Sequence, residues 1–228
     1  MSPSHGHTPR RANFLASLEE VRQQFQLHIF GALAFTQRFI THFRERRSGH
    51  IFLVSSVATG FTPPQWGAYS ASKAGLEMYA ETLARELALF GVKVHCLVPG
   101  HFPTKFFVGH PLYVADGQDA QRTNRKKAAT VYTDPSQGYD SINWIPRLYA
   151  SKGWIGDADK LAARVYELVT GTGFAAQILE KGKPEWTRIL CGSDSGMMLL
   201  KGCENLVENI RVTEPIWRST DVSAPTTA

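Results

Sequence analysis

Two strand-like runs separated by a long helical segment constrain the fold of this chain most. Residues 50–56 are apolar at successive positions, which is typical of a strand buried on both faces of a parallel sheet, and residues 92–98 form a second such strand. Residues 68–90 between them predict a helix that Gly91 ends. A third strand is predicted at residues 186–191. The order strand–helix–strand–helix–strand predicts an α/β fold with a parallel sheet of about three strands flanked by long helices.

Capping residues define the other helices. Ser17 and Glu20 have the spacing of a capping box, and apolar residues then recur at helical intervals, so one long helix is expected over residues 17–47, ended by Ser48 and Gly49. Further helices are expected at residues 157–171, with Asp157 or Asp159 as the capping residue and Gly171 as the end, and at residues 194–212.

The chain is expected to hold one folded domain between two irregular ends. Its 228 residues with 43% apolar content can bury a core. The domain is expected over residues 17–218, after a disordered or irregular tail at 1–16 and before a mobile tail, rich in Thr, Ser and Pro, at 219–228. Residues 101–155 are aromatic-rich without clear periodicity, so we expect a substrate loop or lid with short helices there.

Composition excludes several classes of protein. The net charge is +5, but the basic runs at residues 44–47 and 125–127 lack an accompanying aromatic platform, so they indicate a helix end and a solvated loop and not a nucleic-acid site. Three widely spaced cysteines favour a reducing compartment over a disulfide framework. No apolar run approaches the roughly 20 residues of a membrane span, and the start lacks the apolar core of a secretory signal. The sequence therefore predicts a cytoplasmic protein that binds neither nucleic acid nor a membrane, and it predicts no metal site.

Tyr69 and Lys73 carry the chemistry that the sequence indicates. Positions four apart share a helix face, so the Lys73 ammonium is expected beside the Tyr69 phenol. A phenol ordinarily has a pKa near 10, and a fixed cation lowers that pKa. Such a phenol can give a proton to a carbonyl oxygen or take one from an alcohol. Ser56, at the carboxyl end of the first strand, can hydrogen-bond the same oxygen.

Further residues fall at the same edge of the predicted sheet. Pro99 and Gly100 end the second strand, and Thr104 follows them. Taken singly, each residue has an ordinary explanation: Tyr69 can be a helix aromatic, Ser56 a strand-end cap and the Pro-Gly pair a turn. Together and in register, behind a long first helix, they resemble the catalytic half of the short-chain dehydrogenase/reductase family.

The resemblance implies a partial Rossmann-like sheet and a set of functional residues. Tyr69 and Ser56 would be catalytic, and Lys73 would be both catalytic and cofactor-binding. The implied cofactor is NADP or NAD, because the segment that would select between the two is absent. It would contact Tyr69, Lys73, Pro99, Gly100, Phe102 and Thr104.

His28 departs from the family pattern. Members usually have Asn three residues before the glycine of the first helix, here Gly31, and that Asn anchors a water that relays protons behind the lysine. An imidazole can also donate, accept and bind water. His28 is therefore either a further catalytic residue or a histidine hydrogen-bonded inside a helix interface.

The second departure concerns the amino-terminal half of the family. Its glycine-rich turn, charged selector and Asn-Ala-Gly segment are missing, and the resemblance covers the chain from about Ser17 onward, roughly the last two-thirds of a full member. The Gly-x-Gly-x-x-Ala string at residues 171–176 follows a helix, so it is expected to be a helix C-cap and not a phosphate cradle.

Three functional interpretations follow. The first is an oxidoreductase that moves hydride between NAD(P)H and a carbonyl or alcohol of a medium-sized, apolar substrate, similar to reductases that tailor natural products in fungi. The second is a truncated, non-catalytic remnant that acts through dimerisation, because the two long helices pair in dimers of the family and an exposed sheet edge favours pairing. The third is an incomplete gene product. Small residues that would permit a homo-oligomer to form through the second helix are Ala71, Ala74 and Gly75.

Overall fold

The computed structural model describes residues 17–61, 66–102, 104, 156–181 and 188–221. The predicted tail at 1–16, nearly all of the predicted lid at 101–155 and most of the predicted tail at 219–228 lie outside these ranges.

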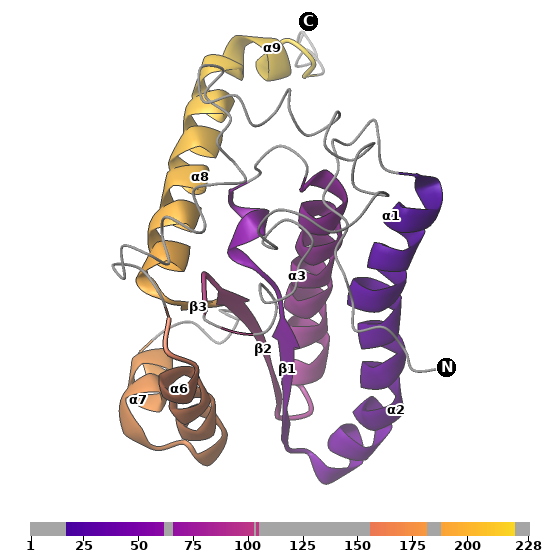
Figure 1. Cartoon of the computed structure of the whole chain (residues 1–228), viewed down its shortest axis with the longest axis vertical. Coiled ribbons are helices and arrows are strands. Elements are labelled where there is room, and N and C mark those ends of the chain that lie inside the picture. The colour runs from indigo at the N-terminus through magenta and orange to yellow at the C-terminus, as the bar shows by residue number, and fades with distance from the viewer. Residues whose placement is uncertain (1–16, 62–65, 103, 105–155, 182–187, 222–228) are drawn as a thin grey trace, which may run out of the picture.

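A parallel three-stranded sheet forms the centre of the described fold (Figure 1). Strand β1 (Gly49–Val54) pairs with β2 (Val92–Pro99), and β2 pairs with β3 (Arg188–Cys191), in the order β1-β2-β3. Gly49 lies opposite Val92 at one end, and Pro99 lies opposite Cys191 at the other. The predicted α/β fold with a parallel sheet is confirmed.

The first long helix contains an irregular segment that the sequence did not predict. It consists of α1 (Leu18–Phe25), the π-helical η2 (Gln26–Phe30) and α2 (Gly31–Arg46). The predicted capping box is confirmed, because Ser17 Oγ accepts from the Glu20 N–H while the Glu20 carboxylate accepts from the Ser17 N–H. The helix ends at its C-cap Arg47, which is left-handed with φ 52°, and Gly49 begins β1. The predicted helix end near Arg47 is therefore confirmed.

The remaining helices lie between the strands and after the last one in the chain. Helix α3 (Gly67–Ala88) links β1 to β2. Helix α6 (Ala158–Thr170) begins at the predicted cap, Asp157, and ends at Gly171 as expected. Helix α8 (Ser193–Val212) follows β3. The sequence did not predict α7 (Gly173–Glu180), α9 (Glu214–Arg218) or the 3₁₀ turn η3 (Val57–Thr59) that follows β1.

The sheet buries a different apolar cluster on each face. On the α3 side, helix residues such as Leu76 and Leu83 pack with Ile51 and Val94 of the strands. On the other side, a smaller cluster joins Leu97 and its neighbours to apolar residues of α6. Cys96 and Cys191 are free and buried, as expected of thiols that pack as small hydrophobes, and Cys203 is free and exposed. Within the described ranges, no helix combines the length and apolar character that crossing a membrane requires.

Candidate active site

The fold brings the predicted site residues to the carboxyl ends of β1 and β2. Ser56 follows β1 and caps η3, while Pro99 and Gly100 form the end of β2. Tyr69 and Lys73 lie in the first turns of α3, the helix that packs on these two strands. In open parallel sheets this edge is where ligands bind.

Tyr69 is buried among two aromatic rings and one ammonium. Its ring meets the Trp66 ring edge to face at 5.3 Å between centroids and the His28 ring edge to face at 5.4 Å. Lys73 Nζ lies 5.9 Å from the Tyr69 ring centroid. The structure therefore places three predicted residues, His28, Tyr69 and Lys73, in one cluster.

The Lys73 ammonium reaches back to the sheet. Its Nζ donates to the carbonyl oxygen of Val54, the last residue of β1, over 2.8 Å. Burial lowers the pKa of Lys73 from 10.5 to about 8, and a smaller opposing effect from Cys96 does not cancel it. The amine is therefore mostly charged at neutral pH, but its pKa is close enough to neutrality for it to lose a proton readily.

A hydrogen-bond chain fixes the tautomer of His28. Ser72 Oγ donates to the backbone oxygen of Tyr69 over 2.8 Å, which uses its only hydrogen. The 2.8 Å contact between His28 Nδ1 and Ser72 Oγ must then have Nδ1–H as the donor. Burial, with the nearby Lys73 charge, lowers the pKa of His28 to about 4, so the ring is neutral at pH 7 and its Nε2 is an acceptor.

Ser56 is held in place by its neighbours. Its Oγ accepts from the Ala58 N–H at 3.3 Å, which leaves the hydroxyl hydrogen out of this contact. Ser55 Oγ donates to Glu77 Oε1 over 2.6 Å, and Thr59 Oγ1 donates to the same oxygen over 2.8 Å. These two bonds anchor the turn around Ser56 to α3.

Glu77 and its partner Arg188 form an ion pair that was not predicted from the sequence. Glu77 is 3% exposed, and its other oxygen, Oε2, pairs with Arg188 Nε at 3.2 Å. Arg188 Nε also contacts Glu81 Oε1 at 2.8 Å. A glutamate in the middle of an apolar helix face was the available signal, because a buried carboxylate requires partners.

The end of β2 is clamped by a second buried carboxylate. Asp194 Oδ2 accepts from the backbone N–H of His101 at 2.7 Å and contacts His101 Nδ1 at 2.6 Å. Gly100 N–H donates to the Cys191 oxygen over 2.9 Å. A Cβ at Gly100 would collide with the Asp194 carboxylate, so only glycine fits between the turn and α8.

The two remaining predicted cofactor residues follow this turn. Phe102 is buried, and its backbone oxygen accepts from the Thr104 N–H over 2.8 Å. Thr104 itself is exposed. Both residues therefore lie just beyond the carboxyl end of β2, and their contact with a cofactor stays a prediction.

The glycine string at 171–176 does not form a phosphate cradle. Gly171 ends α6 with φ 68°, which confirms the expected C-cap. At the start of α7, the Glu167 carboxylate accepts from the Ala175 N–H over 2.8 Å. A carboxylate therefore already occupies the helix N-terminus that a phosphate would need.

Residues 6–110 match the sequence model of the family described as short chain dehydrogenase. This segment, 105 of the 228 residues, is therefore similar to that family. The match begins before Ser17 and ends at residue 110, so it differs from the expected extent of the resemblance, which began near Ser17 and continued through the rest of the chain.

Individual proteins are similar to part of this chain. A 3-ketodihydrosphingosine reductase of Bacteroides thetaiotaomicron is 35% identical over 105 residues, which are 46% of this chain and 39% of the relative. The oxidoreductase claN of Passalora fulva is 42% identical over 89 residues, which are 38% of this chain and 40% of the relative. The matches to these curated relatives thus span about two-fifths of their length.

A solved structure extends the likeness beyond the sequence match. A short-chain dehydrogenase from Streptomyces avermitilis superposes with a TM-score of 0.66 at 26% identity. The similarity covers 96% of this chain and 69% of that one. The described sheet and helices therefore have the Rossmann-like arrangement of a short-chain dehydrogenase.

Proposed function

We propose that this protein is an oxidoreductase of the short-chain dehydrogenase type, which interconverts a carbonyl and an alcohol with a nicotinamide dinucleotide as cofactor. The proposal depends on one observation, the cluster of His28, Tyr69 and Lys73 beside the end of β1. The proposed catalytic residues are Tyr69, Ser56, Lys73 and His28.

Proton transfer is the task of Tyr69. Its hydroxyl gives a proton to the carbonyl oxygen during reduction and takes it back during oxidation. The Lys73 ammonium stabilises the phenolate that remains, and its lowered pKa, about 8, lets it pass a proton on. Neutral His28, with Nε2 as an acceptor, can continue this relay. The Ser56 hydroxyl donates to the substrate oxygen and orients it.

The described residues fit one end of the cofactor. When bound, NADP or NAD would supply or accept the hydride. Lys73 retains two N–H groups beyond its bond to Val54 for a ribose hydroxyl. The turn at Pro99 and Gly100, with Phe102 and Thr104, would hold the nicotinamide side. Among residues with described positions, the glycine string at 171–176 is unsuited to the diphosphate, as Glu167 blocks it.

The proposed substrate is medium-sized and apolar, and natural-product tailoring is the proposed context. A cavity of about 520 Å³ opens beside His28 and Lys73, and its other walls are mostly apolar side chains of α2 and β1. Ligand cavities of this size and lining suit such molecules. A cytoplasmic location stays a prediction.

Titration with NADPH, followed by nicotinamide fluorescence, tests the proposal. We expect saturable binding, and we expect Tyr69→Phe to lower turnover at least about 100-fold while binding changes by less than about threefold. Tyr79→Phe, on the same helix but away from Lys73, is the matched control and should keep turnover. Absence of binding at millimolar NADPH, or full turnover by Tyr69→Phe, would contradict the proposal.

A second candidate function is a non-catalytic protein that forms homo-oligomers through its long helices. Exposed apolar side chains favour it. Phe35 and Phe39 on α2 are 69% and 44% exposed, and their ring centroids lie 4.8 Å apart. Gly75, by contrast, packs against Ile29 within the chain, since a Cβ there would meet Ile29 Cδ1 at 2.7 Å. Sedimentation of the wild type against Phe35→Glu distinguishes an oligomer on this face from a monomer.

A further inference from the structure

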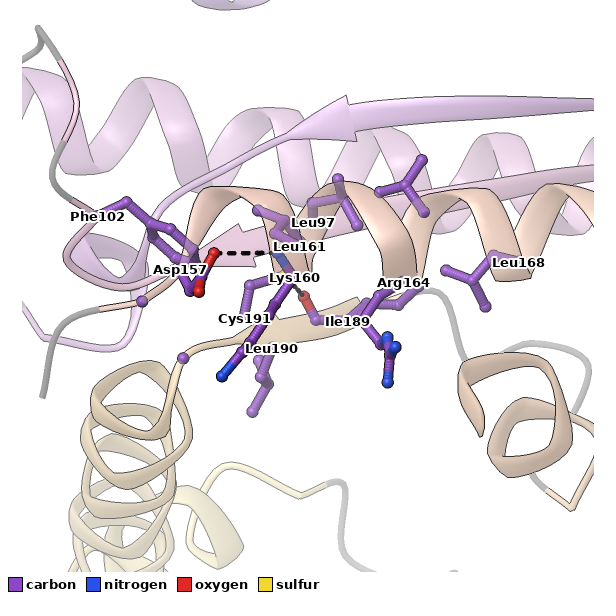
Figure 2. A pocket seen from close by; sticks show the side chains of 13 residues that line it. Leu97, Phe102, Asp157, Lys160, Leu161, Arg164, Leu168, Ile189, Leu190 and Cys191 are labelled. Carbon is purple, nitrogen blue, oxygen red and sulfur yellow. Dashed lines mark hydrogen bonds between the residues drawn. The ribbon is translucent and has the colours of Figure 1, made fainter. Parts of the chain in front are cut away.

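A second cavity lies on the sheet face opposite α3, between α6 and β3 (Figure 2). Its volume is about 510 Å³, within the range of sites for small organic ligands. It shares none of the residues that line the cavity beside His28 and Lys73. It is therefore a separate candidate site.

The floor of this cavity is apolar and already formed. Buried Leu97, Phe102 and Cys191 make a cluster against which Leu161 and other residues of α6 pack. Burial raises the pKa of the Cys191 thiol to about 11, so this side chain stays uncharged at neutral pH. The floor therefore suits a hydrocarbon group.

Close packing holds the Phe102 wall in place. A Cβ at Gly156 would collide with the Phe102 ring, and the Gly156 N–H donates to the His101 oxygen over 2.8 Å. The Phe102 ring therefore has little freedom to move into the cavity. The cavity stays open for a ligand.

Two cations of α6 stand at the rim. Lys160 and Arg164 are one helical turn apart and both line the cavity; Figure 2 shows the end of Lys160 directed toward Leu190 and that of Arg164 directed away from it. Lys160 is exposed. Arg164 Nη2 pairs with Glu167 at 2.7 Å, but its Nε is buried and has no hydrogen-bond partner in the structure. A buried N–H of this kind costs free energy until an acceptor reaches it.

One acidic residue also lines the cavity. Asp157 caps α6, and its Oδ1 accepts from the N–H groups of Asp159 and Lys160. Its charge is offset by the helix N-terminus that it caps. Lys160 and the unpartnered Arg164 Nε are thus the groups left to meet a ligand.

We propose that this cavity binds an alkyl carboxylate, with the hydrocarbon chain on the apolar floor and the carboxylate at Lys160 Nζ and Arg164 Nε. The carboxylate supplies the acceptor that Arg164 Nε lacks, and charge-assisted hydrogen bonds of this kind are the strong ones. The site needs neither Tyr69 nor Lys73, and Phe102 is the residue that it shares with the proposed cofactor contacts.

Calorimetric titration of the full chain with decanoate, below its micelle concentration, tests the proposal, and decanol is the neutral probe of equal chain length. We expect saturable decanoate binding that weakens about tenfold in Lys160→Gln/Arg164→Gln, with decanol binding unchanged. Lys201→Gln, which removes an exposed charge on α8, should change neither. Leu190→Ser should weaken both probes, because it removes an apolar side chain that lines the cavity.

The double variant also removes the ion pair between Arg164 and Glu167, and this loss could unfold α6. Lys160→Gln alone keeps that pair and is therefore the second test. It breaks no ion pair found in the described structure, and it should weaken decanoate about threefold to fivefold without affecting decanol. No saturable decanoate binding, or an equal response of decanoate and decanol to the charge variants, would overturn the proposal.

Discussion

His28 Nδ1 donates to Ser72 Oγ over 2.8 Å and so joins the first long helix to α3. The two residues are 44 positions apart in the sequence. The bond starts from the π-helical segment η2, in which the Gly31 N–H reaches the Gln26 oxygen. Such one-turn irregularities are frequent at functional sites. Here the segment carries His28 to the Tyr69 ring, and Ile29 to the gap left by Gly75.

This bond should appear as a coupling energy. We expect His28→Ala and Ser72→Ala each to lower the free energy of unfolding by about 1–2 kcal/mol, and the double variant to cost about 1 kcal/mol less than their sum. Urea denaturation gives all three values. His28→Ala with Thr82→Ala, an exposed hydroxyl on the same helix, is the control pair and should be additive. Strict additivity of the first pair would mean that the bond contributes nothing.

Local signals in the sequence predicted most of the fold. Ser17 with Glu20, Asp157 and Gly171 act within one helical turn of themselves, so their capping roles could be read directly. The π-helical segment could not be predicted from the sequence, because no local pattern separates it from an ordinary α-helix. What marks it is the packing of His28 and Ile29 on α3. Helix α7 was missed because Gly171, which ends α6, and Gly173, which begins α7, together indicate a turn.

The candidate site was predictable only in part. Tyr69 and Lys73 are neighbours by helical geometry alone, and Ser56 follows from the end of a strand. Ser72 and Glu77 were missed, since their partners lie on other elements that only the tertiary fold brings near. The catalytic and cofactor-binding roles of the predicted residues stay predictions until activity is measured.

Acid should destabilise the fold between pH 6.5 and 4. Burial lowers the pKa of His28 and of His95 to about 4, from 6.5. Below pH 6.5 the unfolded chain therefore binds protons that the folded chain refuses, and the free energy of unfolding falls as the pH falls toward 4. We expect the two histidines together to lower the free energy of unfolding by about 2 kcal/mol over this range. This value allows for solvent screening at His28, which is only partly buried.

Urea denaturation from pH 7.5 to 4.5 measures this slope. His95→Gln keeps a polar group that can bond to His50, yet it cannot titrate, so it should flatten the slope. His42→Gln, an exposed histidine on α2, is the control and should leave the slope unchanged. An identical slope in His95→Gln would exclude His95 as a source of acid sensitivity.

Gly100→Ala should destabilise the end of β2. The added methyl group would meet the Asp194 carboxylate, which is fully buried and tied to His101, so it has no room to retreat. We expect a loss of about 2–4 kcal/mol in the free energy of unfolding. Gly196→Ala is the control: a Cβ there meets nothing within 4 Å, and α8 should gain up to about 1 kcal/mol. Equal stability of the two variants would mean that Asp194 moves freely.

Lys73→Met should stabilise the protein while removing its proposed activity. Burial lowers the pKa of Lys73 from 10.5 to about 8, so holding the ammonium charged below pH 8 costs free energy that an apolar side chain does not. The variant loses the bond to Val54, worth about 1 kcal/mol, and a net gain of about 2 kcal/mol at pH 7 is expected.

The pH dependence of this gain separates desolvation from simple repacking. As the pH rises from 8 toward 10, the folded wild type releases the Lys73 proton while the unfolded chain keeps it, so the wild type recovers stability. The difference between Lys73→Met and wild type in urea denaturation should therefore shrink over this range. A gain that stays constant from pH 7 to 10 would show that the Lys73 charge carries no burial penalty, and the relay role built on its lowered pKa would lose its physical basis.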